Sequence, residues 1–177
     1  MSDQDKQLTI LLKQSDFYGG SVGHVLNTSL LKMYIDGAAR NNPGPAGAGV
    51  CLMRGEETIF EQGFYLGIRT NNQAEYFALL IGSYFVKEYI NIQEQLIIYS
   101  DSLLLVRQMT GLYKVRNPLL QELQKNAYQM LQAFNVKFGH VYRENNTRAD
   151  LLANRGVDKL IPLPKKFVDF MHIHNIK

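Results

Sequence analysis

The stretch IDGAARNNPGPAGAGV, residues 35–50, decides how the rest of the chain is interpreted. The apolar run that leads into it predicts a strand, and this strand meets a carboxylate, Asp36, followed at once by Gly37. After a polar loop with two asparagines and two prolines, glycine alternates with small apolar residues, which predicts a second strand. A carboxylate at the end of a buried strand, beside a turn of small residues, marks a candidate site.

The apolar pattern beyond this stretch predicts a regular alternation of strands and helices. Three early strands follow one another through short connections, so we expect an antiparallel meander. The later strands are separated by helices, which favours parallel pairing and right-handed crossovers. We therefore expect an α/β protein with a five-stranded mixed sheet, three antiparallel strands and then parallel ones. The strands are expected at residues 30–37, 47–55, 58–67, 94–101 and 135–142, and the helices at 71–89, 102–111, 118–134, 145–160 and 165–175.

Composition narrows the class of protein. A chain of 177 residues is long enough for one domain with a proper core, and a formal net charge of +3 permits a polyanionic partner without requiring one. The lone Cys51 excludes a disulfide framework and a cysteine metal cage. The sequence has no apolar run of membrane-spanning length, and its first residues are acidic and polar. We expect a cytoplasmic protein that does not bind a membrane.

Four carboxylates fall near element ends: Asp36 and Asp101 close two strands, and Glu75 and Asp150 fall in the first turns of two helices. Brought to one edge of the sheet, they would repel one another unless a hard cation such as Mg²⁺ or Mn²⁺ neutralised them. Helix N-termini also favour the ionised form, and paired ions suit in-line displacement at a phosphodiester. Taken one at a time, the same acids fit turn formers or helix caps. Spacing alone leaves both interpretations open.

Four segments occur in order along the chain: YIDGAARNNPGPAGAG (34–49), TNNQAEYFAL (70–79), IIYSDSLLLVRQM (97–109) and GHVYRENNTRADLLAN (139–154). Together they resemble type 1 ribonuclease H, whose members cut RNA in RNA–DNA hybrids. The resemblance implies a ribonuclease H-like fold with helices on both faces of the sheet. It also implies a catalytic domain over residues 30–160, between an extension at 1–29 of unknown role and a C-terminal tail at 161–177.

The resemblance also implies a mechanism. Two Mg²⁺ ions, with Mn²⁺ as a substitute, would act on the RNA strand and leave 5′-phosphate and 3′-hydroxyl ends. Asp36 would contact both ions, Asp150 the ion that holds the attacking water, and Glu75 and Asp101 the ion at the leaving group. Glu75 would also sense a 2′-hydroxyl. His140, ten positions before Asp150, matches an auxiliary histidine, although a strand-end cap explains it equally well.

Substrate contacts follow from the same resemblance. Several successive 2′-hydroxyls of the RNA would be read in a shallow minor groove, and Thr70 would grip a DNA phosphate. Because these contacts go to sugar and phosphate, cutting should depend little on base sequence. Each asparagine also fits a turn former or a helix cap, and an asparagine is expected to cap the helix at 145–160. The expected 2′-hydroxyl contacts are Asn41, Asn42, Asn71 and Asn72, with Ala39 contributing only its backbone.

Two features depart from the family. The run from Arg107 to Pro118 is short and holds few cations, so the basic protrusion that grips the hybrid in some members is not evident. Tryptophan is absent, so stacking on a DNA strand would need Tyr, Phe or Arg. An integrase-like or resolvase-like nuclease, or a non-catalytic nucleic-acid-binding relative, is the alternative. We expect a monomer that uses no small-molecule cofactor.

Overall fold

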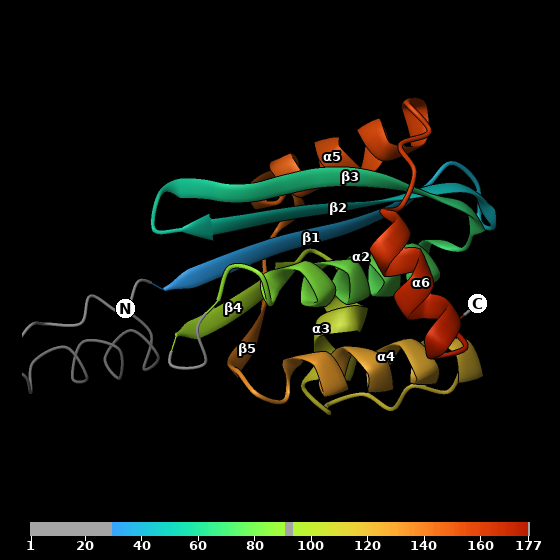
Figure 1. Cartoon of the computed structure of the whole chain (residues 1–177). Helices are drawn as coiled ribbons and strands as arrows, with labels where there is room; N and C mark the ends of the chain where they lie inside the picture. The colour runs from blue at the N-terminus through green and yellow to red at the C-terminus, as the bar shows by residue number, and fades with distance from the viewer. Residues whose placement is uncertain (1–29, 91–93, 177) are drawn as a thin grey trace, which may run out of the picture.

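A computed structural model describes residues 30–90 and 94–176, and the expectations for the 1–29 extension lie outside them. A five-stranded sheet has the order β3-β2-β1-β4-β5 (Figure 1). β1, β2 and β3 are antiparallel, and β4 is parallel to both β1 and β5, which confirms the predicted mixed α/β sheet. The elements are β1 (Leu31–Ala39), β2 (Gly44–Arg54), β3 (Glu57–Arg69), α2 (Asn71–Val86), β4 (Gln95–Ser100), α3 (Leu103–Met109), α4 (Pro118–Leu131), β5 (Asn135–His140), the 3₁₀ turn η1 (Arg143–Asn145), α5 (Thr147–Asp158) and α6 (Lys165–Ile173).

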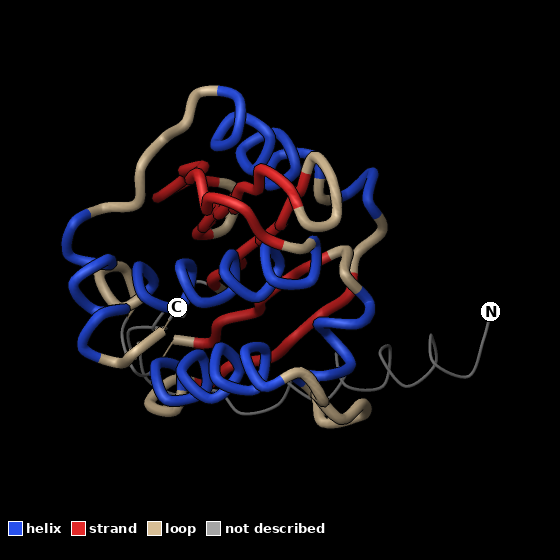
Figure 2. The backbone as a smooth tube through the Cα atoms, turned by 90° about the vertical axis from the view of Figure 1, so that its right-hand side faces the viewer, coloured by secondary structure: helices blue, strands red, loops and turns tan. Residues whose placement is uncertain are grey.

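Helices cover both faces of the sheet, as expected. α5 lies on one face over β2 and β3, while α2, α3 and α4 lie on the other (Figures 1 and 2). The alternating glycines of β2 explain how close α5 comes: a Cβ atom on Gly49 would lie 2.1 Å from the carbonyl oxygen of Ala149. Only a residue without a side chain permits this contact. The glycine pattern therefore sets the position of the helix that carries Asp150.

The main core lies between the sheet and α2. Apolar spacing predicted an amphipathic helix over residues 71–89, but α2 is buried around most of its surface, because it packs against the sheet and against α4. The short helix expected in the C-terminal tail is present as α6. Its Phe167 is fully buried and packs edge-on against Tyr84 of α2, with ring centroids 5.2 Å apart. The tail thus contributes to the same core as the sheet.

Within residues 30–90 and 94–176, no helix is long and apolar enough to cross a membrane.

Candidate active site

A crevice opens where β1 and β4 part. Their parallel pairing extends only to Tyr34 and Tyr99. Asp36 lies two residues after Tyr34, and Asp101 lies two residues after Tyr99. This end of the parallel strands is the usual position of ligand sites in open α/β sheets. The sequence predicted a strand over residues 30–37 with Asp36 near its end, whereas β1 continues beside β2 to Ala39. Pairing with β2 therefore holds the Asp36 backbone on one side, while the other side, toward β4, has no strand partner at this level.

Glu75 reaches this crevice from α2, and Gly37 makes the approach possible. A Cβ atom on Gly37 would lie 2.1 Å from the backbone nitrogen of Glu75, so any larger residue would push the helix away. Glu75 was expected in the first turn of this helix, but it lies in the second turn of α2. Thr70 caps the helix: its hydroxyl accepts from Gln73 N–H, and the Gln73 side chain accepts from Thr70 N–H.

Three of the four predicted carboxylates converge. One oxygen from each of Asp36, Glu75 and Asp101 lies within 4.8 Å of the others. Asp36 and Glu75 are each only 5% exposed. Among the described residues, Glu75 Oε2 is buried without a hydrogen-bond partner. Ser102, rather than Asp101, caps α3 by accepting from Leu105 N–H, which leaves the Asp101 carboxylate available to the cluster.

Burial and mutual repulsion disfavour charge on this cluster. Burial, followed by the charges of Asp101 and Asp150, raises the pKa of Asp36 to about 7. Burial, followed by the charges of Asp36 and Asp101, raises the pKa of Glu75 well above its usual value. A divalent cation would remove both penalties. The all-oxygen donor set and the unpartnered Glu75 oxygen fit a hard ion such as Mg²⁺ or Mn²⁺.

Asp150, the fourth acid, is not among the three whose oxygens converge, and it has cationic and amide partners. It falls in the first turn of α5, as expected, and its charge acts on Asp36. Arg143 Nη2 donates to Asp150 Oδ1 at 2.7 Å, and Asn154 Nδ2 donates to Asp150 Oδ2 at 3.2 Å. Arg143 also lines the acidic cleft, a hollow of about 440 Å³ around Asp36, Glu75 and Asp101.

Two residues of this site escaped the sequence analysis. Arg143, on η1, precedes Asp150 by seven positions, and no local pattern distinguishes it from a surface arginine. Asn146 occupies the N-cap position of α5, yet its side chain makes no capping hydrogen bond, so the expected asparagine cap is wrong. Its amide instead donates toward the acids, to Ile35 O and to Asp101 Oδ1.

Of His140 and the predicted substrate contacts, only some line the acidic cleft. His140 is the exposed last residue of β5, its ring packs edge-on against Tyr142, and its catalytic role stays a prediction. Ala39 and Asn71 line the acidic cleft. Asn42 Oδ1 accepts from Asn71 N–H at 2.9 Å, joining the β1–β2 loop to the start of α2. Two further predicted contacts, Asn41 and Asn72, are exposed.

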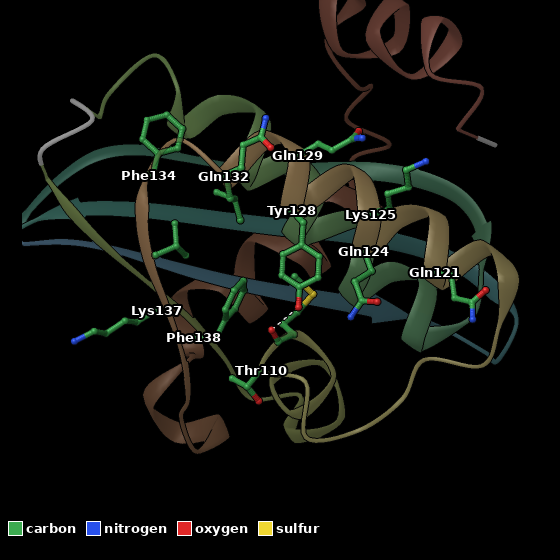
Figure 3. A pocket seen from close by; sticks show the side chains of 13 residues that line it. Thr110, Gln121, Gln124, Lys125, Tyr128, Gln129, Gln132, Phe134, Lys137 and Phe138 are labelled. Atoms are coloured by element: carbon green, nitrogen blue, oxygen red, sulfur yellow. Dashed lines mark hydrogen bonds between the residues drawn. The ribbon is translucent and has the colours of Figure 1, made fainter.

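A larger hollow of about 900 Å³ lies elsewhere, between α3, α4 and β5 (Figure 3). Tyr128 points into it, and its hydroxyl donates to Met109 O. Among the described residues that line it, the charged ones are Lys125 and Lys137, and none is acidic. This hollow therefore does not suit a cation, and the acidic cleft is the better candidate for chemistry.

Comparison with known proteins agrees with the geometry. Residues 34–156 match the family described as "Reverse transcriptase-like". Ribonuclease HI of Halobacterium salinarum is 38% identical over 127 residues, which cover 71% of this chain and 63% of the relative. Ribonuclease H of Methylobacillus flagellatus is 30% identical over 152 residues, covering 77% of this chain and 97% of the relative. The chain belongs to the type 1 ribonuclease H family.

A solved structure of this family has the same fold. It is described as LC11-RNase H1 in complex with RNA/DNA hybrid, and it superposes with a TM-score of 0.70 at 37% identity. The match covers 73% of this chain and 97% of that one. The chain spans less than two thirds of the length of the Halobacterium relative. The resemblance drawn from the four segments is therefore confirmed as family and fold.

Proposed function

We propose that this type 1 ribonuclease H family member is a metal-dependent endonuclease that hydrolyses the RNA strand of RNA–DNA hybrids. The observation that carries the proposal is the convergence of the Asp36, Glu75 and Asp101 oxygens within 4.8 Å at the open end of β1 and β4. The ribonuclease H relatives, and the hybrid bound in the LC11 structure, support the choice of substrate.

The three converging acids would hold a divalent cation, and Asp150 would contribute to a second one when substrate is bound. Mg²⁺, with Mn²⁺ as a substitute, would supply an attacking water and neutralise charge on the leaving oxygen, giving 5′-phosphate and 3′-hydroxyl ends. Asp36 must be ionised to act as a ligand, so its proton leaves when the cation binds. All four acids come from one chain, which supports a monomer as the active form.

Arg143 has a role beside the acids in this proposal. Its side chain is 78% exposed while its guanidinium bonds Asp150, so it can hold that carboxylate in place and still turn toward a phosphate. The bond to Asp150 also raises the pKa of Arg143, which keeps the guanidinium charged. We propose that this cation holds Asp150 in place before substrate arrives and then contacts the scissile phosphate.

The loop after β1 and the start of α2 form the proposed RNA-binding edge. The hydrogen bond between Asn42 and Asn71 holds these two segments together next to the acids. Such an edge can contact 2′-hydroxyls, which distinguish RNA from DNA. Thr70 N–H donates to the Gln73 side chain and the Thr70 hydroxyl oxygen accepts from Gln73 N–H, so the hydroxyl hydrogen is the donor that Thr70 would offer to the DNA phosphate.

The direct test is cleavage of a labelled RNA–DNA hybrid in Mg²⁺. Wild-type protein should cut the RNA strand and leave a matching DNA duplex whole. Asp36→Asn and Asp101→Asn should each abolish cutting while the protein stays folded. Asp169→Asn is the matched control, because this exposed acid on α6 pairs with Lys165 and has no part in the cleft.

The outcomes separate the candidate functions. Equal cutting by wild type and the Asp36 variant would refute the metal assignment. Equal cutting of the DNA duplex would favour an integrase-like or resolvase-like nuclease. Hybrid binding without cutting, in Mg²⁺ and in Mn²⁺, would identify a non-catalytic relative.

A further inference from the structure

Asn146 is almost completely buried, at 1% exposure, and its side chain faces the acids instead of its own helix. Its Nδ2 donates to Ile35 O at 3.0 Å and to Asp101 Oδ1 at 3.2 Å. Ile35 directly precedes Asp36. A single amide therefore joins the backbone beside one predicted ligand to the carboxylate of another, and it does so from the start of the helix that carries Asp150.

This link lies beyond the end of regular strand pairing. The β1–β4 ladder stops at Tyr34 and Tyr99, so sheet hydrogen bonds between these strands do not hold the two aspartates in register. The Asn146 amide spans the strand ends at that level. Both of its partners are acceptors, so its NH₂ group must face them, and the orientation of the amide follows from its contacts.

Asn146 breaks two local rules to make this link. Asparagine is among the best N-cap residues, yet this one leaves the α5 N–H groups without its side-chain oxygen. Among the described residues, Asn146 Oδ1 is also buried without a hydrogen-bond partner. Exceptions to local rules of this kind gather at functional sites, where the surrounding structure holds them in place.

We propose that Asn146 is a positioning residue that sets the cation affinity of the acidic cleft. It holds one oxygen of Asp101, leaves the other to face the cluster, and keeps that carboxylate at a constant distance from the β1 backbone that carries Asp36. The inference rests on the proposed metal-dependent function. Partners that orient ligands in this way typically change metal affinity by ~10- to 100-fold when they are removed.

Asn146→Ser is the decisive variant. Serine is itself a good N-cap, so α5 should keep or gain stability, but the shorter hydroxyl cannot reproduce both contacts of the amide. Asn146→Ala removes the contacts without offering a cap. The control is Asn145→Ala, at the exposed neighbouring position. Mn²⁺ binding to the full-length protein without substrate is measured by calorimetry, and thermal unfolding is measured in a chelator.

We expect Asn146→Ser to unfold at or above the wild-type temperature and to bind Mn²⁺ ~10- to 100-fold more weakly, with the control unchanged. In the hybrid assay, the Mg²⁺ concentration for half-maximal rate should rise by a similar factor. Unchanged Mn²⁺ affinity in Asn146→Ser would overturn the inference and leave the proposed function standing. If wild-type protein neither binds Mn²⁺ nor cuts the hybrid, the proposed function itself fails.

Discussion

Replacing Asp36 with asparagine should stabilise the metal-free protein at neutral pH, although it removes a proposed ligand. Asp36 is 5% exposed, and burial and the neighbouring acids raise its pKa from 3.8 to about 7. Above pH 7 the folded protein must carry this charge beside Asp101 and Asp150. Asparagine has nearly the same shape and no charge, so the repulsion disappears.

The size of the effect follows from linkage. A pKa that folding raises by about three corresponds to ~4 kcal/mol of stability lost once the group ionises. A carboxyl with a raised folded pKa contributes stability fully below the unfolded pKa and loses it as pH rises through the folded value. The loss of folding stability caused by ionised Asp36 therefore grows between about pH 4 and pH 7 and is constant above that range. Because the buried amide still needs hydrogen-bond partners, we expect a net gain of about half, ~2 kcal/mol, at pH 8.

Urea unfolding in a chelator, at pH 4 and at pH 8, measures this directly. At pH 4, where Asp36 is protonated in the folded wild type, Asp36→Asn should be less stable by ~2 kcal/mol, because only the cost of the buried amide remains. At pH 8 the variant should be the more stable by ~2 kcal/mol. Saturating Mg²⁺ should reverse the order, because only the wild type gains ~3 kcal/mol from a ligand present at 100 times its dissociation constant. Equal stability in chelator at pH 8 would refute the view that the acids repel one another in the cleft.

Three further predictions concern the metal affinity of the wild type and the stability of two variants. Mn²⁺ affinity of the wild type should increase from pH 6 to pH 8, since the proton on Asp36 has to leave, and calorimetry in two buffers would show its release. Phe167→Ala should lower the free energy of unfolding in urea by ~3 to 5 kcal/mol, because it empties a fully buried site under α6. Gly37→Ala should cost ~3 kcal/mol in the same assay and reduce hybrid cleavage, because its Cβ would displace the backbone at Glu75.

Local sequence patterns predicted the strands and helices well, because secondary structure depends largely on the spacing of nearby apolar residues. Apolar spacing indicated each strand and helix, and Pro118 marked the start of α4. Errors arose where two signals competed at one position. Thr70 was predicted to grip a DNA phosphate, and the structure shows it as the N-cap of α2, where Gln73 completes its capping box. Asn146 makes no capping hydrogen bond to α5, because its side chain is turned to donate to Ile35 O and Asp101 Oδ1. Such competition is invisible until distant segments meet.

The sequence by itself determined the family, the order of the elements and the position of each acid near an element end, since periodicity and short motifs are written along the chain. Only the tertiary structure decided that Asp36, Glu75 and Asp101 meet and that Gly37 admits α2 beside them. It alone also shows that Arg143 donates to Asp150 and Asn146 to Asp101. These contacts depend on where the β1–β4 ladder stops and how closely helices approach the strands. Those distances come from packing through space, which spacing along one chain does not record.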